Sequence, residues 1–150
     1  MILSAQSIIA RSEMIYPFSF RSKAHGLTFG IGPAGYDVRI AEMLFLPSGG
    51  FELASTIERF KMPDDILGIV HDKSTWARQG IALQNTVIEP GWSGFLTIEV
   101  SNHGHYPVSI KEGSPIAQII FHQLDHATNS PYDGKYQNQE AGPQAAIFDD

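Results

Sequence analysis

Two glutamates lie ten positions apart between Ile88 and Val100, in a stretch that combines a turn with an alternating strand pattern. Glu99 belongs to the segment GFLTIEVSN, whose period of two places Leu96, Ile98 and Val100 on one face and Phe95, Thr97, Glu99 and Ser101 on the other. A glutamate on such an alternate face is usually solvated. In a closed pocket, desolvation would raise its pKa and suit it for general acid–base catalysis near neutral pH. The pattern alone leaves both interpretations open.

Glu89 begins the tetrapeptide EPGW, which is typical of a type II turn. Pro90 fixes φ at the second position, and Gly91 can supply the positive φ that the third position requires. Glu89 is therefore either an ordinary acidic turn residue or part of a site. Trp92 follows the turn, and its ring is either a core residue or a platform under a sugar or base.

The decapeptide HDKSTWARQG, residues 71–80, is rich in hydrogen-bond donors. One interpretation is a helix N-terminus that Asp72 or Ser74 caps, with the other side chains solvated. The other interpretation is an anion site suited to a polyphosphate, because free N–H groups at a helix start would lie beside a lysine and two hydroxyls. Its side chains would be Lys73, Ser74, Thr75 and Arg78.

Metal chemistry has little support in the sequence. His122 and His126 are four positions apart and His103 and His105 flank a glycine, but these pairs are expected at a strand end and in a hairpin loop. The chain has no cysteine, which excludes disulfides, thiolate zinc sites and a cysteine nucleophile. It also excludes the P-C-x-x-C motif of zinc-dependent deaminases.

The elements that would position these residues are mostly short strands. From Gly26 onward, short apolar runs alternate with turns that use many of the 14 glycines and 9 prolines, which predicts an all-β sandwich or barrel. Ser4 is expected to cap a short helix that buries Ile8 and Ile9. The apolar run 116–121 predicts a strand buried on both faces. We expect one domain over residues 1–150, with a polar tail from Asn129 that is mobile when the site is empty.

The composition of the chain limits which partners the protein can bind and where in the cell we expect it. A net charge of −6, with only 10 Lys and Arg residues, argues against nucleic acid as a partner. A small phosphorylated molecule stays possible, because it needs only a few well-placed donors. No segment has the pattern of a signal peptide or of a membrane span, so we expect a cytoplasmic protein that does not bind a membrane.

Five blocks occur in an order and spacing that closely resemble the dCTP deaminase and dUTPase superfamily: PAGYDVRI, HDKSTWARQGI, NTVIEPGWSGFLTIEVSN, EGSPIAQIIF and KYQNQ. The resemblance runs from about Gly30 to Gln139. It implies a distorted jelly-roll β-barrel of the dUTPase-like type with a short N-terminal helix. It also implies a homotrimer that shares active sites between subunits and binds dCTP or a related deoxynucleoside triphosphate. Mg²⁺ would enter with the triphosphate, without direct protein ligands, and no zinc would take part.

Three features favour the deaminase branch of this superfamily. Glu99 aligns with the glutamate that activates water in deaminases, Arg78 follows Ser74 by four residues as in their catalytic network, and YDGKYQNQ resembles their closing segment. The alternatives are a dUTPase or a bifunctional enzyme, in which Glu89 would be the key acid. A nucleotide-binding regulator without catalytic activity is the alternative from another class of protein.

The resemblance assigns a role to individual residues. It implies Glu99, Ser74 and Arg78 as catalytic residues, and it implies the following as substrate-binding residues: Lys73, Thr75, Asn85, Thr86, Val87, Glu89, Trp92, Tyr132, Lys135, Tyr136 and Gln139. The tail, residues 129–150, would close over the site. Four residues depart from the usual pattern. Glu89 replaces aspartate, Lys73 stands where arginine is commoner, and Val87 replaces an arginine found in some deaminases. Thr86 falls between the histidine of one type of deaminase and the small residue of the bifunctional enzymes.

Overall fold

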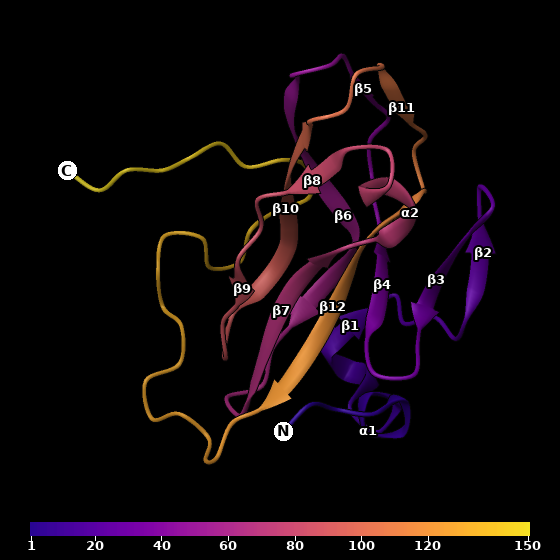
Figure 1. The fold of residues 1–150 in the computed structure, drawn as a ribbon. Coiled ribbons are helices and arrows are strands. Elements are labelled where there is room, and N and C mark those ends of the chain that lie inside the picture. The colour runs from indigo at the N-terminus through magenta and orange to yellow at the C-terminus, as the bar shows by residue number, and fades with distance from the viewer.

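The computed structural model describes residues 1–150, and its regular secondary structure is almost entirely strand (Figure 1). The helical elements are short: α1 Ala5–Ile9, η1 Ser12–Met14 and α2 Ser74–Ala77. The strands are β1 Ile15–Tyr16, β2 Ser22–Ala24, β3 Leu27–Ile31, β4 Tyr36–Arg39, β5 Leu44–Leu46, β6 Phe51–Lys61, β7 Ile66–Asp72, β8 Ile81–Leu83, β9 Val87–Ile88, β10 Ser93–Asn102, β11 Val108–Ile110 and β12 Pro115–Gln123. The predicted all-β class is confirmed.

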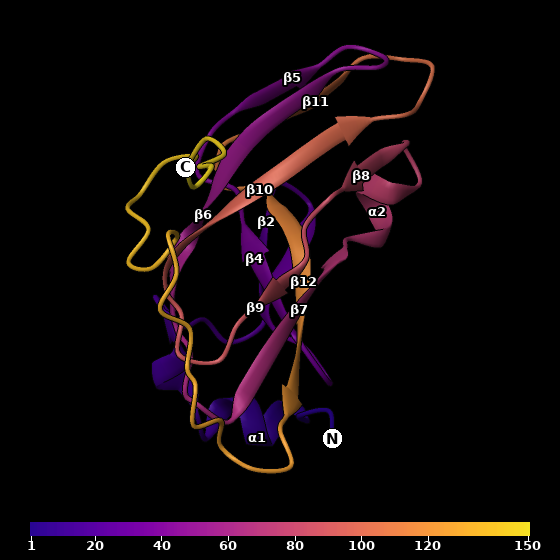
Figure 2. The same ribbon diagram turned by 90° about the vertical axis from the view of Figure 1, so that its left-hand side faces the viewer.

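Two larger antiparallel sheets face one another, as Figure 2 shows. One has the order β1-β6-β10-β8 and the other β2-β3-β4-β12-β7-β9, while β5 and β11 form a separate pair. Side chains from both larger sheets, among them Tyr36, Phe60, Ile98 and Phe121, belong to one buried apolar core. The expected closed barrel is not formed, because short edge strands such as β8 and β9 end the sheets without pairing with each other.

The N-terminal helix and the strand over residues 116–121, which local patterns predicted, are both present as α1 and β12, but several of their details differ from the prediction. Ile8 is fully buried in α1, but Ile9 is 38% exposed because consecutive helical residues point in different directions. Ser4 makes no side-chain hydrogen bond to the helix backbone, so it is not the predicted cap. The central strand β12 is mostly buried, yet Gln118 and Ile120 remain half-buried.

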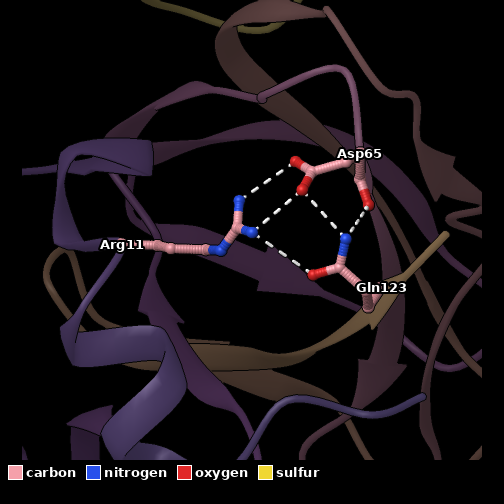
Figure 3. A network of polar contacts seen from close by, with 3 residues as sticks. All are labelled: Arg11, Asp65 and Gln123. Atoms are coloured by element: carbon pink, nitrogen blue, oxygen red, sulfur yellow. Dashed lines mark hydrogen bonds and ion pairs between the residues drawn. The ribbon is translucent and has the colours of Figure 1, made fainter. Parts of the chain in front are cut away.

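A polar network joins the N-terminal segment to the ends of two strands (Figure 3). The Arg11 guanidinium donates to both carboxylate oxygens of Asp65, at 3.0 and 2.9 Å, and also to the Gln123 side-chain oxygen at 3.3 Å. The Gln123 amide in turn donates to Asp65 at 2.9 Å. The network therefore fixes the segment after α1 against the start of β7 and the end of β12.

No helix in the structure is both long enough and apolar enough to cross a membrane.

Candidate active site

A cavity of about 530 Å³ lies beside β9 and β10 and is partly walled by the tail. It brings together many residues that the sequence singled out: Asn85, Thr86, Val87, Glu89, Trp92, Glu99, Tyr132, Tyr136 and Gln139. The remaining residues of that set do not line it: Lys73, Ser74, Thr75, Arg78 and Lys135. One chain therefore assembles the part of the site that contains both glutamates, but not the part on α2.

Glu99 is half-buried in the wall of this cavity, on β10 opposite Leu53 of β6. Burial raises the pKa of its carboxyl, while its own main-chain N–H lowers that pKa to a smaller extent. The Oε2 atom is fully buried and has no hydrogen-bond partner. A carboxylate with a raised pKa that lines a cavity can accept a proton from a molecule held there. The pocket interpretation of Glu99 is thus the one that the structure supports.

Asn85 fixes the loop before β9 against the backbone on either side of Glu99. Its side-chain oxygen accepts from the Glu99 N–H at 3.1 Å, and its amide donates to the Thr97 carbonyl at 2.7 Å. The Gln84 N–H also donates to the Glu99 carbonyl, at 3.0 Å. The polar atoms of Asn85 therefore position β10, and any contact that Asn85 makes with a substrate is additional to this role.

A bulge interrupts the alternation that the sequence predicted for β10. The pairing of β10 with β6 shifts between Phe95 and Thr97, and the Leu96 N–H donates to the Thr56 hydroxyl at 3.0 Å. Leu96 and Thr97 consequently both line the cavity. The prediction that Leu96 shares a face with Ile98 was wrong here, because simple alternation holds only where the ladder is regular.

The turn before β10 has the geometry that the sequence predicted. The Trp92 N–H donates to the Glu89 carbonyl at 3.1 Å, and Gly91 adopts φ = +84°. Trp92 is only 7% exposed, and its ring centroid lies 6.4 Å from that of Phe60. The core interpretation of Trp92 is therefore confirmed, and its remaining surface lines the cavity.

Residues 131–139 of the tail run beside this turn and β10 (Figure 2), whereas the C-terminal end points away from the sheets (Figure 1). The Tyr132 N–H donates to the Pro90 carbonyl at 2.9 Å, the Phe95 N–H to the Gln139 carbonyl at 3.0 Å, and the Trp92 indole to the Tyr136 carbonyl at 2.6 Å. The Gln139 amide donates to the Thr97 hydroxyl at 2.6 Å. Main-chain groups of Tyr132, Tyr136 and Gln139, together with the Gln139 side chain, thus hold this part of the tail against the turn and β10.

The short helix α2 is anchored differently from the prediction. Lys73, not Asp72 or Ser74, occupies the N-cap position, and no side chain caps the helix. Asp72 instead accepts from the Leu83 N–H at 2.9 Å. Ser74 and Arg78 are exposed, and the Lys73 ammonium lies 2.7 Å from the carboxylate of Asp37.

Local sequence patterns missed half of the cavity wall. The missed residues are Phe51, Leu53, Val70, Gln84, Ile88, Leu96, Thr97, Gln144 and Ala146. Thr97 could have been found, because it was predicted on the face of Glu99. Phe51 and Leu53 carried no such signal, since β6 is distant in sequence and reaches the cavity only by pairing with β10.

Comparison of the sequence with protein families identifies the family of this chain. A family model described as dCTP deaminase-like matches residues 37–124. The chain belongs to the dCTP deaminase-like family. The match covers α2 and both glutamates, whereas the tail lies beyond it. The superfamily resemblance seen in the sequence is thereby confirmed.

Individual relatives support the family assignment. The dCTP deaminase of Campylobacter fetus subsp. fetus is 35% identical over 86% of this chain and 87% of its own length. The dCTP deaminase of Pyrococcus horikoshii is 33% identical, with coverage of 86% and 87%.

Solved structures support the fold. The Agrobacterium tumefaciens dCTP deaminase has a TM-score of 0.67 at 19% identity, over 83% of this chain and 48% of that chain. The EIAV dUTPase has a TM-score of 0.60 at 23% identity, over 81% of this chain and 98% of that chain. At these identities the two likenesses show a shared fold only.

Proposed function

We propose that this member of the dCTP deaminase-like family hydrolyses dCTP to dUTP and ammonia. The observation that carries the proposal is Glu99, which lines a nucleotide-sized cavity and whose carboxyl has a pKa raised by burial. The curated relatives at up to 35% identity are named dCTP deaminases, which supports the same reaction.

In the proposed reaction, Glu99 takes a proton from water as the water oxygen bonds to C4 of the cytosine ring. The same carboxyl passes this proton to N3. It then takes the proton of the new hydroxyl group at C4 and passes it to the amino group, so that the C4–N bond breaks, ammonia leaves and the carbonyl of uracil forms. Such proton transfer contributes roughly 10²–10⁴ in rate. Asn85 contributes by fixing the main chain of Glu99 and Thr97, so that the carboxylate does not need to reorganise during the reaction.

We propose that three copies of the chain assemble, with α2 of one subunit completing the cavity of the next. The exposure of Ser74 and Arg78, and their position outside the cavity of their own chain, support this arrangement. Ser74 and Arg78 would then orient the water and polarise the site from the neighbouring subunit. The chain would act as one unit, with residues 129–150 closing over the base and phosphates through Tyr132, Lys135, Tyr136 and Gln139.

Magnesium is proposed to enter with the substrate. No group of three or more His, Asp or Glu side chains is placed to hold a metal ion together. In the proposed reaction the triphosphate carries the ion, without direct ligands from the protein. When bound there, Mg²⁺ would neutralise part of the phosphate charge.

One observation favours a second candidate, the hydrolysis of dUTP to dUMP and pyrophosphate. Glu89 lines the same cavity as Glu99, so an acid is also available to direct water at the α-phosphorus. A bifunctional enzyme would use both glutamates in turn, and a regulator without catalytic activity would use neither.

Product analysis after incubation with dCTP or dUTP and Mg²⁺ separates these possibilities. We expect ammonia and dUTP in equal amounts from dCTP. Glu99→Gln should lower this rate by at least about 10²-fold while nucleotide binding persists, and Glu89→Gln should act mainly on KM. For a dUTPase the opposite result is expected: Glu89→Gln should abolish the release of pyrophosphate from dUTP, and Glu99→Gln should have little effect. Full ammonia release by Glu99→Gln would contradict the mechanism. If the wild type converts neither dCTP nor dUTP, the protein is a nucleotide-binding regulator without catalytic activity.

A further inference from the structure

The Thr97 hydroxyl lies in the wall of the cavity with a hydrogen that no group of the protein receives. Thr97 is only 8% exposed and lines the cavity together with Glu99. Its hydroxyl takes part in two hydrogen bonds and is the acceptor in both, from the Gln139 amide at 2.6 Å and from the Gln144 N–H at 3.0 Å. The proposed reaction does not use this side chain.

The donors fix the direction of these two hydrogen bonds. The main-chain N–H of Gln144 can only donate. The Gln139 amide nitrogen also donates to the Phe95 carbonyl at 2.9 Å, and because a carbonyl only accepts, this nitrogen and not the amide oxygen faces Thr97. A hydroxyl oxygen has two acceptor positions and one hydrogen to donate. The tail fills both acceptor positions, so the Thr97 hydroxyl can meet a third group only as a donor.

The acceptor for this hydrogen is not the neighbouring carboxylate. Glu99 follows Thr97 by two residues on the same side of β10, yet no hydrogen bond joins the two side chains, and Glu99 Oε2 has no partner at all. A buried donor without an acceptor is unfavourable. The acceptor is therefore expected on the molecule that fills the cavity.

The place of Thr97 relative to Glu99 decides which atom of a base it meets. The pairing of β10 with β6 is regular from Thr97 to Glu99, so the two residues are two strand steps apart, roughly 6–7 Å. In the proposed reaction Glu99 acts at C4 and N3 of the ring. The C2 carbonyl oxygen lies at the other end of the Watson–Crick edge, which is the edge that enzymes read on a base held in a pocket. With Glu99 at the C4 end, this edge brings the carbonyl oxygen to Thr97.

We propose that the Thr97 hydroxyl donates a hydrogen bond to the C2 carbonyl oxygen of the pyrimidine base. The proposal rests on the proposed function for the placement of the base in the cavity. Cytosine and uracil both have this oxygen, so Thr97 recognises substrate and product alike. At the same end of the Watson–Crick edge adenine has a C–H group and guanine an amino group, and neither accepts a hydrogen bond. Thr97 then selects pyrimidines over purines, while Glu99 acts on the amino group of cytosine.

Binding of nucleotides that cannot react tests this contact. The α,β-imido analogue of dUTP keeps the C2 carbonyl, has no amino group to lose and resists cleavage between its α- and β-phosphates. Its 2-thio counterpart carries sulfur, a weak acceptor, in place of the carbonyl oxygen. Thr97→Val should weaken binding of the oxygen analogue about 5- to 10-fold more than binding of the 2-thio analogue, because only the former loses a hydrogen bond. Equal weakening of both would show that the tail alone was loosened, and this result or unchanged binding would overturn the proposal.

Two further variants separate the hydroxyl from general effects of substitution. Thr97→Ser keeps the hydroxyl and should bind both analogues within about twofold of the wild type. Thr28→Val is the matched control, since it makes the same exchange on β3, which does not line the cavity, and it should leave both affinities unchanged. Thr97→Ser that behaves like Thr97→Val, or a control that weakens the oxygen analogue selectively, would contradict the assignment. Should Thr97→Val fail to fold, Thr97→Ala replaces it with the same expected ratio.

Steady-state kinetics connect the contact to the reaction. Because the C2 oxygen is held in the substrate and the transition state alike, Thr97→Val should raise KM for dCTP about 5- to 10-fold and change kcat by less than about threefold. A fall in kcat of about 10²-fold at unchanged KM would overturn this binding role. If the wild type does not deaminate dCTP, the proposed function fails, and the two analogues still decide whether Thr97 contacts the C2 oxygen.

Discussion

Glu99 combines two properties that oppose each other. Its carboxyl must ionise to act as a base, yet the cavity wall solvates the ionised form poorly and leaves Oε2 without a partner. The folded protein is therefore less stable when Glu99 is charged than when it is neutral. Such a cost is typical of active sites, where residues are selected for reactivity and not for stability.

We predict that Glu99→Gln stabilises the protein at neutral pH. Because the pKa of Glu99 is raised in the folded state, folding favours the protonated form, and stability falls as the pH rises from the unfolded-state pKa through the folded-state value. The variant should melt at a higher temperature than the wild type at neutral pH, by about 2 °C or less because the carboxyl is only half-buried. The two curves should converge at acid pH, where both states of the wild type are protonated. The exposed Glu52→Gln is the control, and an equal melting temperature of Glu99→Gln and wild type at every pH would contradict the prediction.

At the scale of elements, two glycines make room for the tail. Gly91 and Gly94 adopt φ of +84° and +146°. A Cβ on Gly94 would lie 2.7 Å from the Gln139 nitrogen, and a Cβ on Gly91 would lie 2.6 Å from the Pro131 Cβ. The segment between them thus needs glycine both for its backbone conformation and for the close approach of the tail.

We predict that Gly94→Ala detaches the tail and raises KM for dCTP about tenfold or more, because the tail is proposed to cover bound nucleotide. Limited proteolysis between residues 131 and 139 should become faster, while the rest of the protein stays resistant. Truncation after Ser130 should reproduce the kinetic effect. Gly49→Ala is the control, since Gly49 also has a positive φ of 79° but a Cβ there would meet no atom within 4 Å. Unchanged kinetics of the truncated protein would show that the tail takes no part in the site.

For the whole molecule, the division of the site between α2 and the cavity makes a prediction about assembly. Glu99→Gln and Arg78→Ala should each be inactive alone. Because a proposed shared site needs Glu99 from one subunit and Arg78 from another, co-expression of the two variants should restore roughly a quarter of the wild-type activity in randomly mixed trimers. Activity assays and the solution mass of the mixture are the measurements. A monomeric mass, or no recovery in mixed trimers, would refute the shared site.

The network of Arg11 makes a second prediction at this scale. The hydrogen bonds from Arg11 and then Gln123 lower the pKa of Asp65, so the contribution of this carboxylate is present above its unfolded pKa and is lost as the pH falls through the folded value. Arg11→Met should cost about 1 kcal/mol or less at neutral pH, since water screens the pair. The cost should shrink at acid pH, as thermal unfolding at several pH values would show. A constant cost at every pH would mean that packing, not the ion pair, is responsible.

The sequence by itself determined the features that depend on chain neighbours. Glu89, Pro90 and Gly91 specify their turn because φ is restricted residue by residue, and the alternation around Ile98 and Val100 specifies a strand because side chains alternate along any extended backbone. The five ordered blocks specified the family. The all-β class followed from the same short-range patterns.

Only the tertiary structure decided which distant groups meet. Lys73 and Asp37 are 36 positions apart, and their pairing depends on where β4 lies relative to α2. The bulge at Leu96 depends on the register of β10 against β6. The resemblance implied a closed barrel, but the strands form separate sheets. The docking of Gln139 on Thr97 likewise joins segments that no local pattern relates. Strand register and tail docking arise from the free energy of the whole packed chain, which no short segment contains.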